Sequence, residues 1–274
     1  MPELPEVEVT RRGIAPTLTG NRVFAVITRT PALRYPLPEN LTRMLGGQCL
    51  VAVIRRGKYL LLDFGHGHLL IHLGMSGSLR LVPANLPAEK HDHFDLVFGI
   101  QRSKVALRLR DPRRFGAILW LPDDPLRHPL LASLGIEPLT DEFSAGWLKH
   151  ELAGLSAAIK PTLMDGHRVV GIGNIYASES LFRAGIDPRT PAGRISLKRL
   201  ERLVPVIKTT LAAAIDAGGS SLRDFIHSDG SSGYFQQQYF VYGRNGEPCR
   251  VCGRPVRELR QGQRATFYCV GCQK

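Results

Sequence analysis

Cysteines near the end of the chain limit most strongly what this sequence can form. Four of the five cysteines follow the pattern Cys249-x2-Cys252-x16-Cys269-x2-Cys272. Two such pairs place four thiolates around a tetrahedral Zn²⁺, so that protein fills every coordination position. We therefore expect one structural Zn²⁺, which holds a segment too small to fold alone. Disulfide bonds are the alternative, and an intracellular setting disfavours them.

The charge of the chain indicates a polyanionic partner. Lys and Arg number 36 against 24 Asp and Glu, which gives a net charge of +12. Nucleic acid is the simplest such partner, because the rival, a membrane surface, would call for a basic amphipathic helix that does not stand out here. No stretch reads as a membrane span or a signal peptide, so we expect a soluble cytoplasmic protein without membrane contact.

The first part of the chain has the pattern of a β-sandwich or barrel. A length of 274 residues favours two domains over one. Short β-rich runs recur between turn residues, which is typical of these two architectures. The runs are 23–28, 50–54, 59–64, 68–72, 78–82, 94–98, 105–109 and 117–121.

Helical spacing of apolar residues appears on both sides of these runs. A first helix is expected from Glu3 to Leu18, with Pro5 in its first turn. After a proline-rich connection at 122–138, the expected helices are 142–152, 175–184 and 197–217. Pro205 should either bend the last of these helices or mark its true start.

The opening residues carry the candidate chemistry. Methionine before proline is normally trimmed, so Pro2 would present a free secondary amine at a helix start. An α-amino group titrates near ~7.7–8.0, and the uncharged amine attacks carbonyl carbon to form a Schiff base. Glu3 and Glu6 lie close enough to move protons or stabilise a cation. A plain helix start remains the alternative for these residues alone.

Two turns carry residues that suit insertion into a base stack. Met75 lies in a glycine-flanked turn, and Arg113 and Phe115 lie in the turn Asp111–Gly116. Apolar wedges and arginines that enter nucleic acid have this form, although ordinary packing explains each residue separately.

Further polar residues suit phosphate. Asn174 follows Gly171 and Gly173 at a helix start, where phosphate can approach the backbone; an Asn cap is the alternative. The missing third glycine excludes a dinucleotide fingerprint. Lys58 and Arg264 could reach phosphate or remain solvated. We treat the histidines as polar surface or phosphate contacts rather than metal ligands; they include His66, His68, His72, His91 and His93.

Together these stretches resemble one family, the bacterial formamidopyrimidine-DNA glycosylases, also called 8-oxoguanine DNA glycosylase/AP lyases. The matching segments are 1–7 (MPELPEV), 56–61 (RGKYLL), 71–79 (IHLGMSGSL), 90–95 (KHDHFD), 111–116 (DPRRFG), 163–165 (LMD), 169–181 (VVGIGNIYASESL), 228–235 (SDGSSGYF), 241–252 (VYGRNGEPCRVC) and 264–272. The chain departs from the family in lacking a lysine-rich stretch near 152–156, so one phosphate contact should be missing.

The resemblance implies an α+β multidomain fold. Residues 1–129 would form the catalytic β-sandwich with its leading helix, and 130–238 the helical domain with a helix-two-turn-helix. Residues 239–274 would form the four-cysteine zinc hairpin, and DNA would lie in the cleft between the two main domains.

The resemblance also implies roles. The enzyme would excise 8-oxoguanine and formamidopyrimidines from duplex DNA through a Pro2 Schiff base, followed by β,δ-elimination. Glu3 would be the general acid, Glu6 an orienting neighbour, Lys58 the β-elimination residue and Arg264 the δ-elimination residue. The residues expected to contact DNA are Met75, His91, Arg113, Phe115, Asn174, Ser228, Tyr234 and Tyr242.

Two alternatives remain. An endonuclease VIII-type glycosylase would prefer oxidised pyrimidines, but it usually lacks the Leu4 form of the opening and the 111–116 turn. A non-catalytic zinc-hairpin DNA-binding protein would leave Pro2, Glu3 and Lys58 without a role. In either case we expect double-stranded DNA as the partner, no organic cofactor, no obligate protein partner, a monomer, and a nucleoid-associated location.

Overall fold

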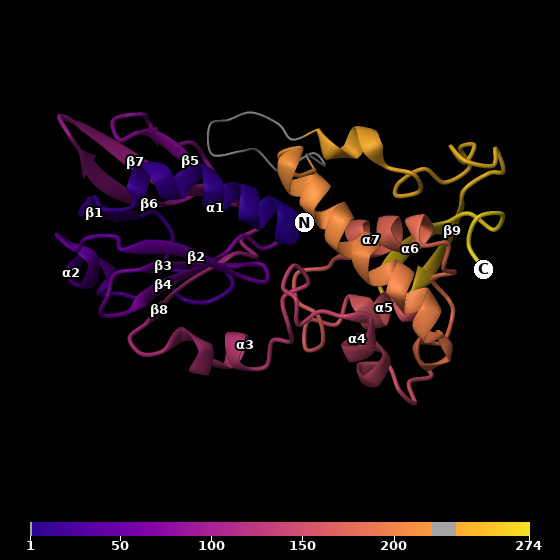
Figure 1. The fold of residues 1–274 in the computed structure, drawn as a ribbon. Coiled ribbons are helices and arrows are strands. Elements are labelled where there is room, and N and C mark those ends of the chain that lie inside the picture. Colours follow the sequence, from indigo (N-terminus) through magenta and orange to yellow (C-terminus); the bar gives the residue numbers. More distant parts are fainter. Residues whose placement is uncertain (1, 221–233) are drawn as a thin grey trace. The chain divides into compact units, whose positions relative to one another are not determined.

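The protein, seen here as a computed structural model, is described for residues 2–220 and 234–274. It forms two compact units (Figure 1). The first unit comprises 1–132 and 217–236, and the second comprises 133–216 and 237–274. The chain therefore leaves the first unit, builds most of the second, and contributes to the first again.

The first unit contains two four-stranded antiparallel sheets. One has the order β1 (Arg22–Thr28), β6 (Asp92–Ile100), β7 (Ser103–Arg110), β5 (Ser78–Pro83). The other has the order β2 (Ala52–Arg56), β3 (Tyr59–Asp63), β4 (His68–His72), β8 (Ala117–Leu121). All eight expected strands are confirmed, with shifts of one or two residues at their ends.

The core of this unit lies among the inward faces of both sheets and helix α1 (Leu4–Leu18). In β6 the alternate residues Phe94, Leu96 and Phe98 are fully buried in this core. Val7 and Ile14 of α1 join the same cluster, which fixes the start of the helix against the sheets. Each such side chain contributes roughly 1.5–3 kcal/mol by burial. A short helix, α2 (Leu41–Leu45), was not expected from the sequence.

Strand register brings two loops to the same edge. His72 at the end of β4 pairs with Ala117 at the start of β8. Ser78 at the start of β5 pairs with Arg110 at the end of β7. The loops 73–77 and 111–116 therefore both cross from one sheet to the other between paired strands.

The connection and the second unit are mainly helical. The elements are η1 (Pro125–Arg127), α3 (Pro129–Ala132), α4 (Ala145–Glu151), α5 (Ile159–Leu163), α6 (Asn174–Arg183), η2 (Ala192–Arg194), α7 (Leu197–Asp216), η3 (Phe235–Gln238), β9 (Arg257–Gln261) and β10 (Arg264–Tyr268). The three helices expected after residue 140 are confirmed as α4, α6 and α7, while α5 is additional.

Pro205 lies inside α7, which excludes the second of the two expected alternatives, that it marks the true start of that helix. Leu200, before the proline, and Ile207 and Leu211, after it, are all buried, so one apolar face continues through this point. Pro205 itself is exposed, where water can solvate the carbonyl that loses its amide partner.

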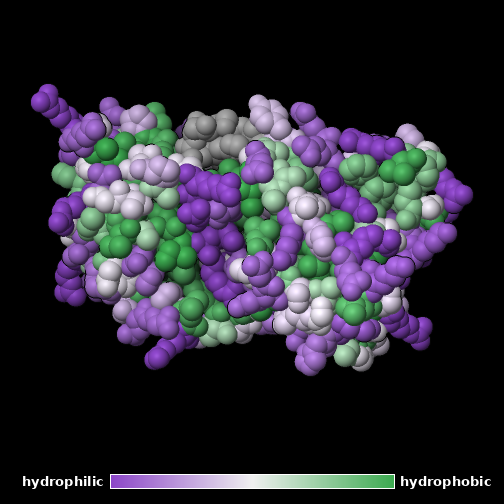
Figure 2. Space-filling model, in the orientation of Figure 1, coloured by the Kyte–Doolittle hydropathy of each residue, from purple (hydrophilic) through white to green (hydrophobic). Residues whose placement is uncertain are grey.

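Hydrophilic side chains cover much of the face seen in Figure 2, with apolar residues between them. Among the described residues, no helix is both long enough and apolar enough to cross a bilayer.

Candidate active site and nucleic-acid interface

The start of α1 buries the residues expected to carry the chemistry. Glu3 is the N-cap of this helix and is only 2% exposed, and Pro2 before it is also buried. Glu6 Oε2 accepts a hydrogen bond from the Glu3 amide at 2.8 Å, and its Oε1 accepts one from the Ser220 amide at 2.8 Å. A carboxylate is favoured at a helix start, where backbone N–H groups point outward. Glu6 therefore fixes the backbone of Glu3 and the chain that returns after α7.

Lys58 lies in the tight turn between β2 and β3, directly after Gly57, whose φ of +56° suits glycine. The neighbouring Arg55 links this turn to α1. Its Nε donates to Glu8 Oε2 at 3.1 Å, and its Nη1 donates to the carbonyl of Gly57 at 3.1 Å. Burial opposes the charge of Glu8, but its arginine partners outweigh burial and lower the pKa of this carboxyl. The ion pair thus stays formed at neutral pH and holds Lys58 on a braced turn.

His72 is a candidate contact that the sequence did not separate from the other histidines. Its Nδ1 accepts a hydrogen bond from the Gly74 amide at 3.1 Å, so Nε2 carries the proton of the neutral ring. Burial, together with the positive charges of Lys58 and Arg34, lowers its pKa from 6.5 to about 4. His72 is therefore a neutral hydrogen-bond donor at physiological pH.

The two loops carry the expected wedge residues at the surface. The Arg113 guanidinium lies over the Phe115 ring, 4.8 Å from its centroid, and Phe115 is 46% exposed. Met75 is half-buried on the neighbouring loop. Such a stacked cation and ring already present a flat surface of the kind that a nucleobase contacts.

Of the other predicted contacts in the first unit, His91 is half-buried and Tyr234 is 63% exposed. Ser228 lies outside the described residues. His93 is 3% exposed and bonds the backbone carbonyl of Asp111, so its interpretation as polar surface is wrong.

In the second unit, a buried lysine joins Asn174 to β10, the strand that begins at Arg264. Lys160 is 1% exposed, and its Nζ donates to Asn174 Oδ1 at 2.6 Å, to the Ala265 carbonyl at 2.9 Å and to Thr266 Oγ1 at 2.7 Å. Because an ammonium only donates, the oxygen of the Asn174 amide faces Lys160 and the NH₂ group is turned away from it. Sequence reasoning missed Lys160, whose only signal was a lysine beside the apolar Ile159.

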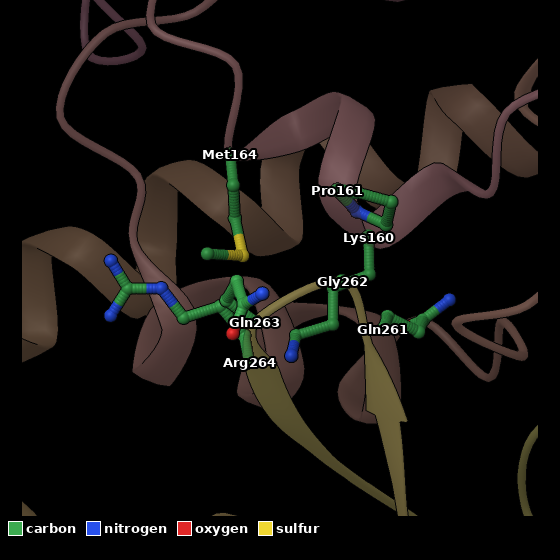
Figure 3. A pocket seen from close by; sticks show the side chains of 7 residues that line it. All are labelled: Lys160, Pro161, Met164, Gln261, Gly262, Gln263 and Arg264. Atoms are coloured by element: carbon green, nitrogen blue, oxygen red, sulfur yellow. The ribbon is translucent and has the colours of Figure 1, made fainter.

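A cavity of about 250 Å³ lies beside this lysine, between α5 and the turn of the β9–β10 hairpin. Figure 3 shows Met164 of the cavity wall pointing toward the hairpin turn, while the guanidinium of Arg264 extends away from it. Arg264 is exposed at the first position of β10, so the hairpin presents its charge to solvent.

Tyr242 is placed by another missed residue. Glu179 of α6 is fully buried, and its carboxylate accepts hydrogen bonds from the amides of Phe240, Val241 and Tyr242, each at 2.9 Å. Three N–H donors offset the cost of burying this charge. The turn that bears Tyr242 is therefore fixed to the same helix that begins at Asn174.

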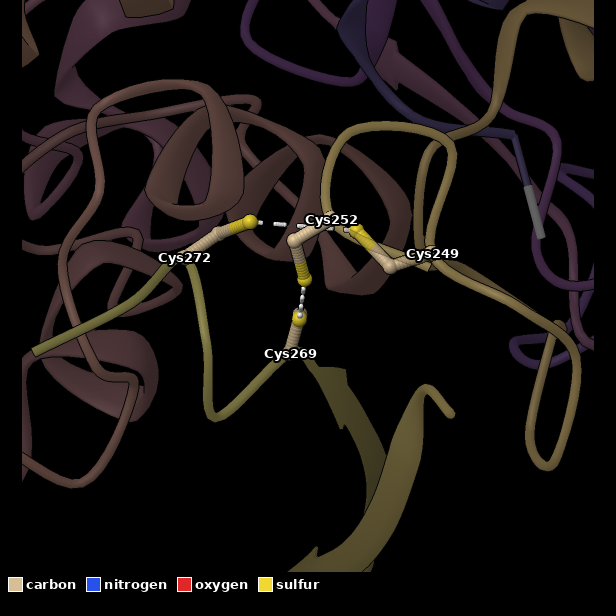
Figure 4. A group of neighbouring side chains, drawn as sticks. All are labelled: Cys249, Cys252, Cys269 and Cys272. Carbon is tan, nitrogen blue, oxygen red and sulfur yellow. Dashed lines mark hydrogen bonds between the residues drawn. The ribbon is translucent and has the colours of Figure 1, made fainter. Parts of the chain in front are cut away.

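The four cysteines of the predicted metal site converge (Figure 4). Their sulfur atoms all lie within 4.8 Å of one another, with Cys249 and Cys272 3.8 Å apart and Cys252 and Cys269 3.4 Å apart. A tetrahedron with Zn–S distances of ~2.3 Å has edges of roughly 3.8 Å, which the Cys249–Cys272 separation matches and the Cys252–Cys269 separation approaches. The site binds a structural zinc ion.

Comparison with known families divides the chain into three matches. Residues 1–118 match the formamidopyrimidine-DNA glycosylase N-terminal domain, and 134–226 match the formamidopyrimidine-DNA glycosylase H2TH domain. Residues 246–274 match the zinc finger found in FPG and IleRS. The fold and these matches define the class of the protein as a zinc-finger DNA glycosylase.

Relatives that match over the full length of the chain indicate the same class of enzyme. The chain is 61% identical to formamidopyrimidine-DNA glycosylase of Aromatoleum aromaticum and 57% identical to that of a Janthinobacterium species, with 100% of each chain covered. The MutM (Fpg) protein of Thermus thermophilus has a similar structure, with a TM-score of 0.87 and 38% identity over 99% of this chain and 98% of that one. Lactococcus lactis Fpg, bound to DNA containing an abasic site, gives 0.90 and 33%, with 99% of each chain covered. The chain belongs to the formamidopyrimidine-DNA glycosylase family.

Proposed function

We propose that this protein is a bifunctional DNA glycosylase and AP lyase that removes 8-oxoguanine and formamidopyrimidines from duplex DNA. The observation that carries the proposal is the buried start of α1, where Glu6 holds Glu3 next to Pro2. An amine and a carboxyl group at one helix start supply a nucleophile and a proton donor. A zinc-hairpin protein without activity would need neither.

Removal of Met1 frees the Pro2 nitrogen, which attacks C1′ of the damaged nucleotide. The bond between C1′ and the base breaks, and the base leaves with a proton. Glu3 protonates the sugar ring oxygen, the ring opens, and the nitrogen lone pair completes an iminium ion. Loss of a proton from C2′ then expels the 3′ phosphate in β-elimination. Lys58 is the residue assigned to this step. A δ-elimination, to which Arg264 is assigned, expels the 5′ phosphate and leaves a gap in the strand.

We assign further residues of both units to phosphate contacts. Asn174, Arg264 and Tyr242 supply donors from the second unit, and Lys58 and His91 from the first. We add His72 to this set, because its neutral ring offers an Nε2 proton next to Lys58. These contacts position the duplex without reading its sequence.

A base within a duplex hides its glycosidic bond, so the damaged nucleotide must be turned out of the stack. Met75, Arg113 and Phe115 fill the space that it leaves, with Arg113 bonding to the orphaned cytosine. Tyr234 and Ser228 cover the extruded base. The exposed Arg113–Phe115 stack supports this assignment.

Borohydride trapping tests the proposal. The protein is incubated with duplexes that carry 8-oxoguanine opposite cytosine, 5-hydroxyuracil, or no lesion. We expect a covalent adduct with 8-oxoguanine and none in Pro2→Gly. The pyrimidine arm is needed because L. lactis Fpg is also known in complex with DNA containing an oxidized pyrimidine. An adduct of equal yield in Pro2→Gly, or in a protein with Met1 retained, would overturn the mechanism.

The domain bounds 1–129, 130–238 and 239–274 belong to the same proposal, as do a monomeric state and a cytoplasmic, nucleoid-associated location. Binding to chromosomal DNA accounts for the net charge of +12.

A further inference from the structure

One fully buried carboxylate joins the two wedge loops. Asp111 follows β7 directly and is 0% exposed. Its Oδ1 accepts hydrogen bonds from the Ser76 hydroxyl at 2.9 Å and the Arg113 amide at 3.3 Å, and its Oδ2 accepts one from the Gly116 amide at 2.8 Å. Ser76 belongs to loop 73–77, whereas the other two donors belong to loop 111–116. The Ser76 hydroxyl also accepts from the Arg113 amide at 3.3 Å, so the Asp111 carboxylate and this hydroxyl together join the two loops.

The backbones of these loops touch at glycines. A Cβ atom added at Gly74, whose φ is +64°, would lie 2.4 Å from the carbonyl carbon of Phe115. One added at Gly116 would lie 2.8 Å from the carbonyl oxygen of His72. Neither position has room for a side chain. Because the backbones are in direct contact there, a shift of one loop must either move the other or open a gap between them.

Loop 111–116 also contains backbone strain. Arg114 has a φ of +55°, a left-handed conformation that costs a residue with a side chain roughly 1–2 kcal/mol. The Asp111 carboxylate bonds the amides of Arg113 and Gly116, on either side of this residue. These bonds offset the strain and keep Arg113 stacked over Phe115.

A third segment is fixed to the backbone of the same aspartate. The Asp111 amide donates to the His91 carbonyl at 3.0 Å, and His93 Nε2 donates to the Asp111 carbonyl at 3.1 Å. Asp111 thus sets the positions of segments that carry Met75, Arg113 and His91.

We propose that Asp111 is a positioning residue that couples the two wedge loops into one rigid block and so determines how Arg113 discriminates the base opposite the lesion. This inference rests on the proposed function, which assigns Arg113 to the orphaned base. Insertion of two separate loops would be imprecise, whereas a joined pair enters the duplex with fixed geometry.

The test compares Ser76→Ala and Asp111→Asn with Ser103→Ala. Ser103 lies at the other end of β7, where its hydroxyl bonds the Ile100 carbonyl, so this variant controls for loss of a serine hydroxyl. For each protein we measure excision of 8-oxoguanine opposite cytosine and opposite adenine, and cleavage of a preformed abasic site. The cytosine-to-adenine ratio of kcat/KM separates positioning from general damage, because a loss of folded protein lowers both rates equally.

We expect the ratio to fall roughly tenfold in Ser76→Ala, because the hydroxyl donates to Asp111 Oδ1 and also accepts from the Arg113 amide, while abasic-site cleavage stays within about twofold. Ser103→Ala should keep the wild-type ratio. An unchanged ratio in Ser76→Ala, with or without a general loss of rate, would overturn the inference even if Asp111→Asn fails to fold. Absence of any trapped adduct in the wild-type protein would instead overturn the proposed function.

Discussion

Glu6 Oε1 accepts a hydrogen bond from the backbone amide of Ser220 at 2.8 Å, across 214 positions of sequence. Its other oxygen serves the Glu3 amide. In Glu6→Gln only one oxygen remains, so one buried N–H faces an NH₂ group. We expect a loss of about 1–3 kcal/mol in the free energy of unfolding and slower borohydride trapping, by roughly tenfold. Glu39→Gln, at an exposed position, is the control. Wild-type trapping in Glu6→Gln would show that the contact has no catalytic consequence.

Arg55→Met should impair the lyase step. The substitution removes the bonds to Glu8 and to the Gly57 carbonyl, which together brace the turn that bears Lys58. We expect β-elimination at a preformed abasic site to slow by roughly three- to tenfold, less than the ~100-fold that a 1 Å displacement can cost, because strand pairing still holds the turn. Arg12→Met is a matched control, because Arg12 pairs with the same Glu8 but is 54% exposed. Equal rates in both variants would count against bracing of Lys58.

Lys160→Met should weaken DNA binding through the second unit. It leaves three acceptors without their ammonium donor, namely Asn174 Oδ1, the Ala265 carbonyl and Thr266 Oγ1. We expect a loss of about 2–4 kcal/mol in stability, and weaker binding with a shallower salt dependence if Asn174 and Arg264 are displaced. Lys208→Met, which removes an exposed bond to the Thr140 carbonyl, should change little. Titration of a fluorescent abasic duplex at several salt concentrations measures both effects.

Zinc removal should act locally. Cys269→Ser removes one of four thiolates from a site whose sulfur atoms lie within 4.8 Å of one another. We expect the β9–β10 hairpin to unfold and DNA binding to fall, while the sandwich, whose core is separate from the cysteines, keeps its own unfolding transition. Hydrogen exchange reports the two regions separately. Retained binding after complete removal of the metal would contradict this expectation.

His72 should make stability depend on pH between about 6.5 and 4, its unfolded and folded pKa values. In this window the unfolded chain binds a proton that the folded ring rejects, so stability is complete above the window and falls as pH decreases. One such proton gives a slope of at most roughly 1.4 kcal/mol per pH unit. His72→Asn keeps an acceptor for the Gly74 amide and does not titrate, so urea denaturation across this range should show a shallower slope. An unchanged slope would assign the dependence to other groups.

The sequence predicted the fold more fully than it predicted the buried residues that position the site. Alternating and helical patterns of apolar residues can be recognised within a short stretch of sequence. The strand from His68 to His72, for example, was predicted with the bounds that the structure shows. The four cysteines were equally clear, because their spacing is local. For Pro205 the sequence left a bend and a helix start as alternatives, and only the structure shows that burial on both sides of it keeps α7 intact.

Lys160, Glu179 and Asp111 were missed for one physical reason. The partners of Lys160 and Glu179 are largely backbone groups or hydroxyls from distant positions, 105 or 106 residues away for the hairpin partners of Lys160 and 61 to 63 for the amides that Glu179 binds. Asp111 bonds two amides of its own turn, but its link to the second loop is not local. Even the bond between Asp111 and Ser76 spans 35 residues. A charged residue in an apolar stretch signals burial, but only the tertiary structure names its partner.

The first unit is assembled from two pieces of chain, 1–132 and 217–236. During synthesis, the ribosome must therefore release more than eighty further residues before the later piece becomes available. The eight strands of the sandwich end at Leu121 and can pair before that piece emerges, but the bond between Glu6 and Ser220 can form only afterwards. A shortened gene that ends at residue 132 would accordingly encode all eight strands but leave Glu6 without its bond to the Ser220 amide.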